Sequence, residues 1–248
     1  TFVSKNVPLE GRCTLGPASP TPMGGVLLIG DSLLRHSGKS CVENGVKLSV
    51  HPGAKIAQIK SKLESYEGGQ PDVIYLLVGT NDLVHGYNGR SGYNGGWGKR
   101  AALHSMADLL CTARRRFPKS RIVVNSVICR RDINNTALRY FNEQLDYMCN
   151  NFGAHFADAN LIINKSHLGR DGRHLNGHGN TLLGDFIFYY IIQVLAGTLE
   201  GPVFDNSSSQ LPLSDHNSPY CEAKGPALPF FSPPLSGNGF ESLPPSQD

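Results

Sequence analysis

The 248-residue sequence has no cysteine pattern typical of a disulfide framework or a zinc site. Its six cysteines are scattered, without a Cys-x-x-Cys pair or a Cys/His cluster at zinc spacing. His174 and His178 lie four residues apart, but no third ligand has a fitting spacing. We therefore expect free thiols, no bound metal ion and an intracellular, cytoplasmic protein, with secretion as the alternative that the cysteines leave open.

The sequence also lacks a long apolar run and an excess of charge of one sign. No run approaches the length of a membrane span, and no basic segment precedes an apolar one near residue 1. The formal net charge of +3 is too small to indicate a nucleic-acid-binding protein. Because the chain starts without Met, we expect a fragment of a longer protein, for which a missing leader proves nothing.

Both ends of the chain are rich in proline and lack hydrophobic periodicity. Residues 198–248 hold nine of the sixteen prolines, among Ser, Asn and Gly. Such composition is typical of linkers and disordered tails, because too little apolar surface is available to form a core. The sequence predicts a linker or disordered segment over 1–23, one domain over 24–197 and a Pro/Ser-rich disordered tail over 198–248.

Strand-like and helix-like segments alternate between these flanks. Short apolar runs predict strands, and longer segments with apolar residues at helical spacing predict the helices between them. This alternation predicts a five-stranded parallel sheet in a three-layer α/β/α, flavodoxin-like domain. The predicted strands are 26–29, 46–50, 73–78, 121–128 and 154–158. The first predicted helix begins after Ser32 and ends near residue 40, and the other helices cover about 56–63, 99–117, 134–151 and 177–195.

Residues 83–98 combine glycine, asparagine and tyrosine and are predicted to form a loop, since such a mixture disfavours a helix. Loops at the carboxyl edge of a parallel sheet commonly carry function, and aromatic side chains suit the cover of a pocket. This composition is equally compatible with a loop that shapes the substrate-binding site and with an ordinary surface connection. The sequence does not decide whether the loop is a lid.

A Gly-Asp-Ser turn at residues 30–32 directly follows the first predicted strand. The turn stands at the carboxyl end of a buried parallel strand, which is where ligands bind in open α/β sheets. Ser32 is therefore a candidate nucleophile. The alternative is that Asp31 or Ser32 merely caps the next helix.

A second chemically rich turn, at residues 171–174, holds a carboxylate and an imidazole just before the last predicted helix. Serine is a weak nucleophile and needs a base, and the base needs a partner that fixes its tautomer. His174 and Asp171 fit these two roles. A solvated loop histidine is the ordinary alternative.

Four short motifs resemble those of the SGNH, or GDSL, hydrolase family and occur in the same order along the chain as in that family. The resemblance covers about residues 24–197. The Gly-x-Ser-x-Gly elbow of the larger α/β-hydrolases is absent, which disfavours that fold. Four motifs in order are far more specific than any one of them. The motifs are Gly-Asp-Ser-Leu at 30–33, His-Pro-Gly-Ala at 51–54, Gly-Thr-Asn-Asp at 79–82 and Asp-x-x-His at 171–174.

The resemblance implies a serine esterase that acts on small acyl esters without a cofactor. It makes Ser32 the nucleophile, His174 the general base and then acid, and Asp171 the residue that orients the imidazole. It also implies an oxyanion hole formed by the main-chain amides of Ser32 and Gly53 and the side-chain amide of Asn81. A plain strand-end turn is the alternative for residue 53.

The amino-acid sequences of the motifs are most similar to those of the esterase domain in the first-frame protein of LINE-type retrotransposons. That resemblance implies a domain of a longer protein, with element RNA or membrane lipid as partners. A secreted carbohydrate deacetylase and an intracellular enzyme similar to platelet-activating-factor acetylhydrolases share the same motifs. The oligomeric state and the acyl and alcohol parts of the substrate are not defined by the sequence.

Basic residues concentrate between positions 114 and 131, at the end of one predicted helix and around the next strand. Positive charge is favourable at a helix C-terminus without any ligand. The alternative function is an RNA-binding or lipid-binding module on the same fold, with secondary or no catalysis. A third possibility is that the domain serves assembly of its parent protein.

Overall fold

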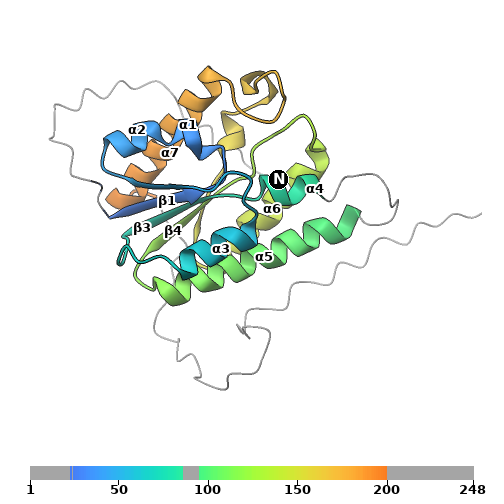
Figure 1. Ribbon diagram of the computed structural model, residues 1–248. Coiled ribbons are helices and arrows are strands. Elements are labelled where there is room, and N and C mark those ends of the chain that lie inside the picture. The colour runs from blue at the N-terminus through green and yellow to red at the C-terminus, as the bar shows by residue number, and fades with distance from the viewer. Residues whose placement is uncertain (1–22, 24, 86–94, 200–248) are drawn as a thin grey trace, which may run out of the picture. The chain divides into compact units, whose positions relative to one another are not determined.

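The computed structural model describes residue 23, residues 25–85 and residues 95–199, and these belong to one compact unit (Figure 1). The predictions for segments 1–23 and 198–248 fall almost entirely outside the described residues, as does the middle of the predicted loop 83–98.

Five parallel strands form one sheet in the order β2-β1-β3-β4-β5, which confirms the predicted sheet and its three-layer fold. All residues of β1 and β3 are buried, because helices cover both faces of the sheet. Their near-continuous apolar sequences follow from this burial. The strands are β1 (Val26–Gly30), β2 (Lys47–Val50), β3 (Val73–Leu77), β4 (Arg121–Asn125) and β5 (His155–Ala157).

The helices form two layers around the sheet (Figure 1). One layer holds α1 (Leu34–Ser37), α2 (Lys39–Glu43) and α7 (Gly177–Ala196), and both short helices pack against α7. The other holds α3 (Ile56–Glu64), α5 (Gly95–Arg116) and α6 (Asn135–Asn151), with α5 between the other two. Three short elements complete the described fold: α4 (Thr80–His85) and the 3-10 turns η1 (Ala159–Leu161) and η2 (Lys165–His167).

The sequence fixes both ends of α7, the helix that follows the second chemically rich turn. Asn176 caps its start, where the side-chain oxygen accepts a hydrogen bond from the Gly179 amide at 2.8 Å. Gly197 ends it in a left-handed conformation, with φ of 68°, which glycine adopts without strain. The capped start places the turn at 171–174 at a defined position relative to the sheet.

The expectation that no run approaches a membrane span is wrong for α7. This helix is long and apolar enough to cross a membrane by length and composition alone. Burial accounts for part of its apolar character: Leu183, Ile187 and Ile191 on one face are fully buried in the core of the domain, whereas 33% of the apolar window as a whole is buried. A buried core helix passes the same test of length and hydropathy.

Two predicted boundaries are also wrong. Residues 83–85 belong to α4 and residues 95–98 to α5, so the predicted loop is shorter than 83–98. Once a helix is nucleated, extending it by a turn costs little, and the packed part of α5, with Met106, Leu109 and Leu110 buried, carries its glycine-containing start. The strand predicted over 121–128 ends at Asn125, because the side chain of Asn142 takes both the N–H and the C=O of Val127 at 2.9 Å.

A buried polar contact joins two neighbouring strands at the centre of the fold. The Tyr75 hydroxyl donates to Asn125 Oδ1 at 2.7 Å, and both side chains are fully buried. The Asn125 amide in turn donates to the Ser126 carbonyl at 2.7 Å. The network satisfies these polar groups without water, as a buried site requires.

We expect Tyr75→Phe to lower the free energy of unfolding by about 1 to 3 kcal/mol, because Asn125 Oδ1 loses its partner in a fully buried site. Tyr190→Phe is the matched control, since the Tyr190 hydroxyl bonds the Phe156 carbonyl at 2.8 Å from a half-buried position. Its loss should be smaller. Urea unfolding of the three proteins measures both, and equal losses would contradict the expected difference in burial.

Candidate active site

The carboxyl edge of the sheet brings the predicted site residues together around one cavity of about 290 Å³. Ser32, Gly53, Asn81 and His174 all line this cavity, although they come from four separate segments of the chain. Asp171 contacts His174 from outside the lining. Arginine, proline, threonine and leucine complete the wall: Leu33, Arg35, Pro52, Thr80, Arg130 and Arg173, with Asp31 beside the serine.

The turn that carries Ser32 is held tightly against the neighbouring strand β3. The Asp31 amide donates to the Leu77 carbonyl at 3.0 Å, and a Cβ atom at Gly30 would overlap that carbonyl oxygen. Only glycine permits this close approach. Asp31 Oδ1 accepts a hydrogen bond from the Leu33 amide at 3.0 Å, which closes the turn around Ser32. The serine therefore stands half-buried on a rigid turn at the cavity.

A single carboxylate organises the turn that carries the imidazole. His174 Nδ1 lies 2.6 Å from Asp171 Oδ2, and Asp171 Oδ1 accepts from the amides of Arg173 and His174 at 3.0 and 3.1 Å. The two main-chain bonds and the imidazole hold the pKa of Asp171 well below its usual range. With Nδ1 donating to this carboxylate, Nε2 is the nitrogen left for another partner.

The Ser32 hydroxyl and the His174 ring share the cavity, but no hydrogen bond joins them in the described structure. Catalytic hydrogen bonds are commonly long in ligand-free enzymes and tighten when substrate binds. Ser32 and His174 thus lie at one cavity, and Asp171 and His174 are in contact with each other.

Of the three residues predicted to form an oxyanion hole, Asn81 is bonded to the segment that carries Gly53. Gly53 has φ of 74°, and no atom lies within 4 Å of the position that its Cβ would take. Asn81 Nδ2 donates to the Ala54 carbonyl at 3.1 Å, which ties the third motif to the second. The second N–H of this amide remains for another acceptor. Asp82 Oδ2 strengthens the link by accepting from the Ile56 amide at 3.1 Å.

Asp31 carries a buried carboxyl beside the nucleophile. Its side chain has one bonded oxygen, whereas Oδ2 is buried without a hydrogen-bond partner. Burial raises the pKa of Asp31 to about 6, although the Leu33 amide and the positive charge of Arg130 act in the opposite direction.

Arg130 is a buried cation at the cavity that the sequence motifs did not identify. Arg130 is 8% exposed and donates from Nε and Nη2 to the two oxygens of Asp132, at 2.9 and 2.7 Å. Arg173 Nε lies 3.2 Å from the same carboxylate, so Asp132 bridges two arginines. The sequence marked Arg130 only as part of a basic concentration. In the sequence, only the position of Arg173 inside the Asp-x-x-His motif indicated an arginine at the site.

Three arginines of that basic concentration, Arg114, Arg116 and Arg121, bond main-chain carbonyls. Arg114 donates to three main-chain carbonyls, and burial lowers its pKa. Arg116 bonds the Tyr66 carbonyl, and Arg121 bonds the carbonyls at the end of α7. These guanidinium groups satisfy chain ends and turns, which is the alternative that the sequence left open.

A second cavity, of about 700 Å³, lies between α6 and the segment that includes η1 and η2. It is larger than the first, but none of the predicted site residues lines it. Asn142 and Asn160 in its wall bond the main chain after β4. Size alone therefore does not locate the chemistry, and we assign the site to the smaller cavity.

Within residues 25–85 and 95–199, no group of three or more His, Cys, Asp or Glu side chains could hold a metal ion. The His178 ring packs edge-on against His167, with 5.4 Å between the centroids. Cys41, Cys111, Cys129 and Cys149 form no disulfide bond with one another, as expected for these four.

Residues 25–187 match the GDSL-like lipase/acylhydrolase family. The chain belongs to this family. It is also 26% identical over 168 residues to a multidomain esterase of Ruminococcus flavefaciens, a match that covers 61% of this chain and 20% of that protein. The chain thus spans about a fifth of the length of this relative. The family is described as one of lipases and acylhydrolases, and the relative as an esterase.

Solved structures of the GDSL family share the fold. A GDSL-like lipase from Bacteroides thetaiotaomicron has a TM-score of 0.54 at 16% identity, covering 68% of this chain and 88% of that one. An acetylxylan esterase from Geobacillus stearothermophilus has a TM-score of 0.54 at 14% identity, covering 67% and 93%. At these identities the similarity shows the three-layer fold alone.

The raised pKa of Asp31 predicts a stability that falls as the pH rises. The folded state holds the proton up to about pH 6, whereas the unfolded chain releases it near pH 4. Stability from this group is complete below about pH 4 and is lost as the pH rises to about 6. The loss amounts to about 2 to 3 kcal/mol.

We expect Asp31→Asn to remove this part of the pH dependence, since the amide keeps the Oδ1 acceptor and does not ionise. Urea unfolding at pH 4.5 and pH 7.5 measures the difference between wild type and variant. A variant with an unchanged pH dependence would show that Asp31 titrates normally.

Proposed function

We propose that this ester hydrolase cleaves small, acetyl-like acyl esters with Ser32 as nucleophile, His174 as general base and acid, and Asp171 as the orienting carboxylate. One observation carries the proposal: the 2.6 Å contact between Asp171 and His174 Nδ1 stands at a cavity that Ser32 also lines. A nucleophile, a base and a group that orients the base are the parts that acyl transfer requires.

In the first half of the reaction, His174 Nε2 takes the proton of the Ser32 hydroxyl as its oxygen attacks the ester carbonyl carbon. The ionised Asp171 stabilises the imidazolium that forms. The carbonyl oxygen becomes an oxyanion, and the amides of Ser32 and Gly53 with the free N–H of Asn81 are the proposed donors to it. The intermediate collapses when the imidazolium gives its proton to the leaving alcohol.

In the second half, water replaces the alcohol in the cavity. His174 removes a proton from the water, whose oxygen attacks the acyl carbon bound to Ser32. The same donors hold the second oxyanion, and the imidazolium returns its proton to the serine oxygen as the acid leaves. Each proton moves between His174 Nε2 and the oxygen of Ser32, of the leaving alcohol or of water, so the cycle needs no cofactor.

The dimensions of the cavity support a small acyl group. Its volume of about 290 Å³ is at the lower end of the range for ligand sites, and the wall is largely polar or charged. Such a wall offers little apolar surface to a long hydrocarbon chain. We infer an acyl group of a few carbon atoms.

We also propose that the domain works in the cytoplasm as part of a retrotransposon-encoded first-frame protein. The support for this proposal is the similarity of the motif sequences at 26–32, 51–54 and 171–177 to those of the retrotransposon esterase domain. The competing function as an RNA-binding or lipid-binding module has less support, because Arg114, Arg116 and Arg121 are engaged with main-chain carbonyls.

Ser32→Ala should abolish turnover of a chromogenic acetyl ester and labelling by a fluorophosphonate, since the variant has no nucleophilic oxygen. Ser49→Ala is the matched control, because the Ser49 hydroxyl lies 2.8 Å from His51 Nε2 but does not line the cavity. The control should keep its turnover and its label. Wild-type turnover in Ser32→Ala would exclude Ser32 as the nucleophile.

Asp171→Asn should lower kcat by about 10³- to 10⁴-fold, because the amide cannot stabilise the imidazolium and permits the wrong tautomer. The side-chain oxygen that accepts from the two amides is retained, so the turn should stay folded. Asp185→Asn, an exposed carboxylate on α7, is the control and should keep its kcat. Steady-state kinetics with the acetyl ester give the comparison, and equal kcat values in both variants would contradict the role of Asp171.

A further inference from the structure

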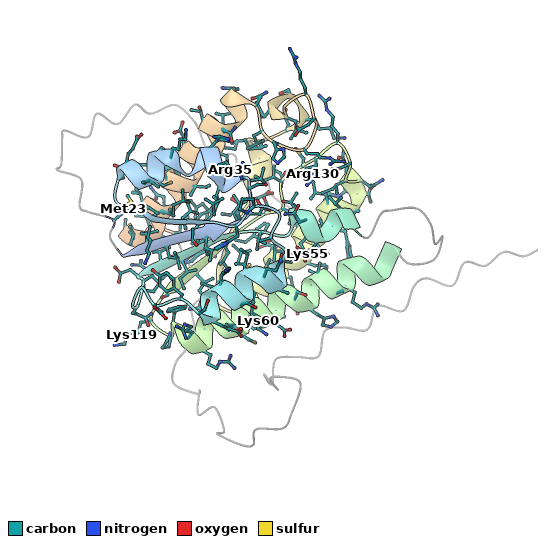
Figure 2. The ribbon with its side chains drawn as sticks, in the orientation of Figure 1. Met23, Arg35, Lys55, Lys60, Lys119 and Arg130 are labelled. Atoms are coloured by element: carbon teal, nitrogen blue, oxygen red, sulfur yellow. The ribbon has the colours of Figure 1, made fainter. Side chains whose placement is uncertain are left out.

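The catalytic cavity is lined by three arginines and only one carboxyl group. Arg35 comes from α1, Arg130 from the segment after β4, and Arg173 from the turn that carries the imidazole. Figure 2 labels the first two, whose segments follow β1 and β4 at the same edge of the sheet. The catalytic steps proposed above use none of these cations.

Arg130 is a buried cation with unused donors. Its contacts to Asp132 engage Nε and one hydrogen of Nη2, while Nη1 has no hydrogen bond to any residue in the described part of the chain. Arginine presents five N–H donors in a fixed plane that matches a carboxylate or a phosphate. Holding a guanidinium at 8% exposure is costly unless its charge and its donors are matched.

Two nearby carboxylates, Asp132 and Asp171, are set back from the cavity. Asp132 and Asp171 do not line it, and Asp132 alone serves both Arg130 and Arg173. Asp31 does line it, but Oδ1 is bonded to the Leu33 amide and Oδ2 is buried. Arg35 is exposed and has no ion pair among the described residues. Three guanidinium groups and one carboxyl group therefore line the cavity.

We propose that the preferred substrates are small esters that carry an anionic group, a carboxylate or a phosphate, which Arg130 binds with the help of Arg35 and Arg173. This inference rests on the proposed serine-esterase function and adds the substrate class to it. The anion would complete the donor set of Arg130 and attract the ester toward Ser32.

A different role for the arginines is to stabilise the oxyanion of every substrate. The two roles differ in what the loss of a charge does. An arginine that binds the substrate's anion changes the ratio of kcat/KM between a charged and a neutral ester. An arginine that acts on the oxyanion lowers kcat/KM for both esters equally and leaves the ratio unchanged.

Two matched ester pairs test the wild-type protein. On the alcohol side, 4-acetoxybenzoate is compared with neutral 4-acetoxybenzamide, with 4-acetoxyphenyl phosphate as the phosphate arm. On the acyl side, monomethyl succinate is compared with methyl succinamate. Each ratio of kcat/KM is divided by the ratio of the hydroxide-catalysed rates, which removes intrinsic reactivity. We expect at least one anionic ester to be preferred by about tenfold, from the usual strength of a charge-assisted hydrogen bond.

Arginine variants then locate the preference. Arg35→Gln should lower the normalised ratio about threefold, the range of an exposed charge pair. Arg130→Lys keeps a charge but loses the planar fork, and we expect about a tenfold fall in the ratio. Arg115→Gln is the control, since Arg115 is exposed at the end of α5 and does not line the cavity. Its ratio should match that of wild type.

The thermal unfolding temperature shows whether the Arg130→Lys variant is folded. If that variant does not fold, the Arg35→Gln variant still tests the inference, because Arg35 is exposed on the surface. Raising the salt concentration should reduce the wild-type preference, since exposed charges are screened. Equal normalised rates for anionic and neutral esters, or equal losses for both in the variants, would overturn the inference while Ser32-dependent turnover stays intact. Turnover that survives Ser32→Ala would instead remove the proposed function itself.

Discussion

The register between β1 and β3 is the constraint on which the site depends. Gly30 pairs with Leu77, and the Asp31 amide then bonds the Leu77 carbonyl, so the two strands end side by side. The serine turn and the start of α4, which carries Asn81, therefore leave the sheet at the same level. A side chain at position 30 would force these strands apart, because its Cβ would overlap the carbonyl oxygen of the neighbouring strand.

The site combines rigid and exposed parts. Ser32 stands on a turn whose backbone is bonded to the sheet, and Asn81 and Asp82 tie the third motif to the loop of Gly53. The imidazole and its carboxylate instead lie on an exposed turn, with about half of each side chain accessible to solvent. That turn gains its order from the carboxylate itself, which bonds the ring and two main-chain amides, and from the capped start of α7 directly behind it.

The same edge of the sheet also contains buried charge. Asp31 and Arg130 are both largely removed from water, which is unfavourable for each of them alone. Each acts on the other through the cavity wall, since the charge of Arg130 opposes the rise in the pKa of Asp31. Natural proteins keep such groups at sites where a ligand or a reaction needs them.

The sequence by itself determined the strands, most of the helices and the identity of the catalytic candidates. Apolar runs with helical or strand periodicity are local, and so are the glycine turns and the order of the four motifs. It overestimated the loop at 83–98 and the length of β4, since helix extension and the bonds of Asn142 depend on neighbours in space. Only the tertiary structure decided that Arg130 lies beside Ser32 while Arg114 and Arg121 close chain ends, because the use of a guanidinium depends on the carbonyls and carboxylates that folding brings within its reach.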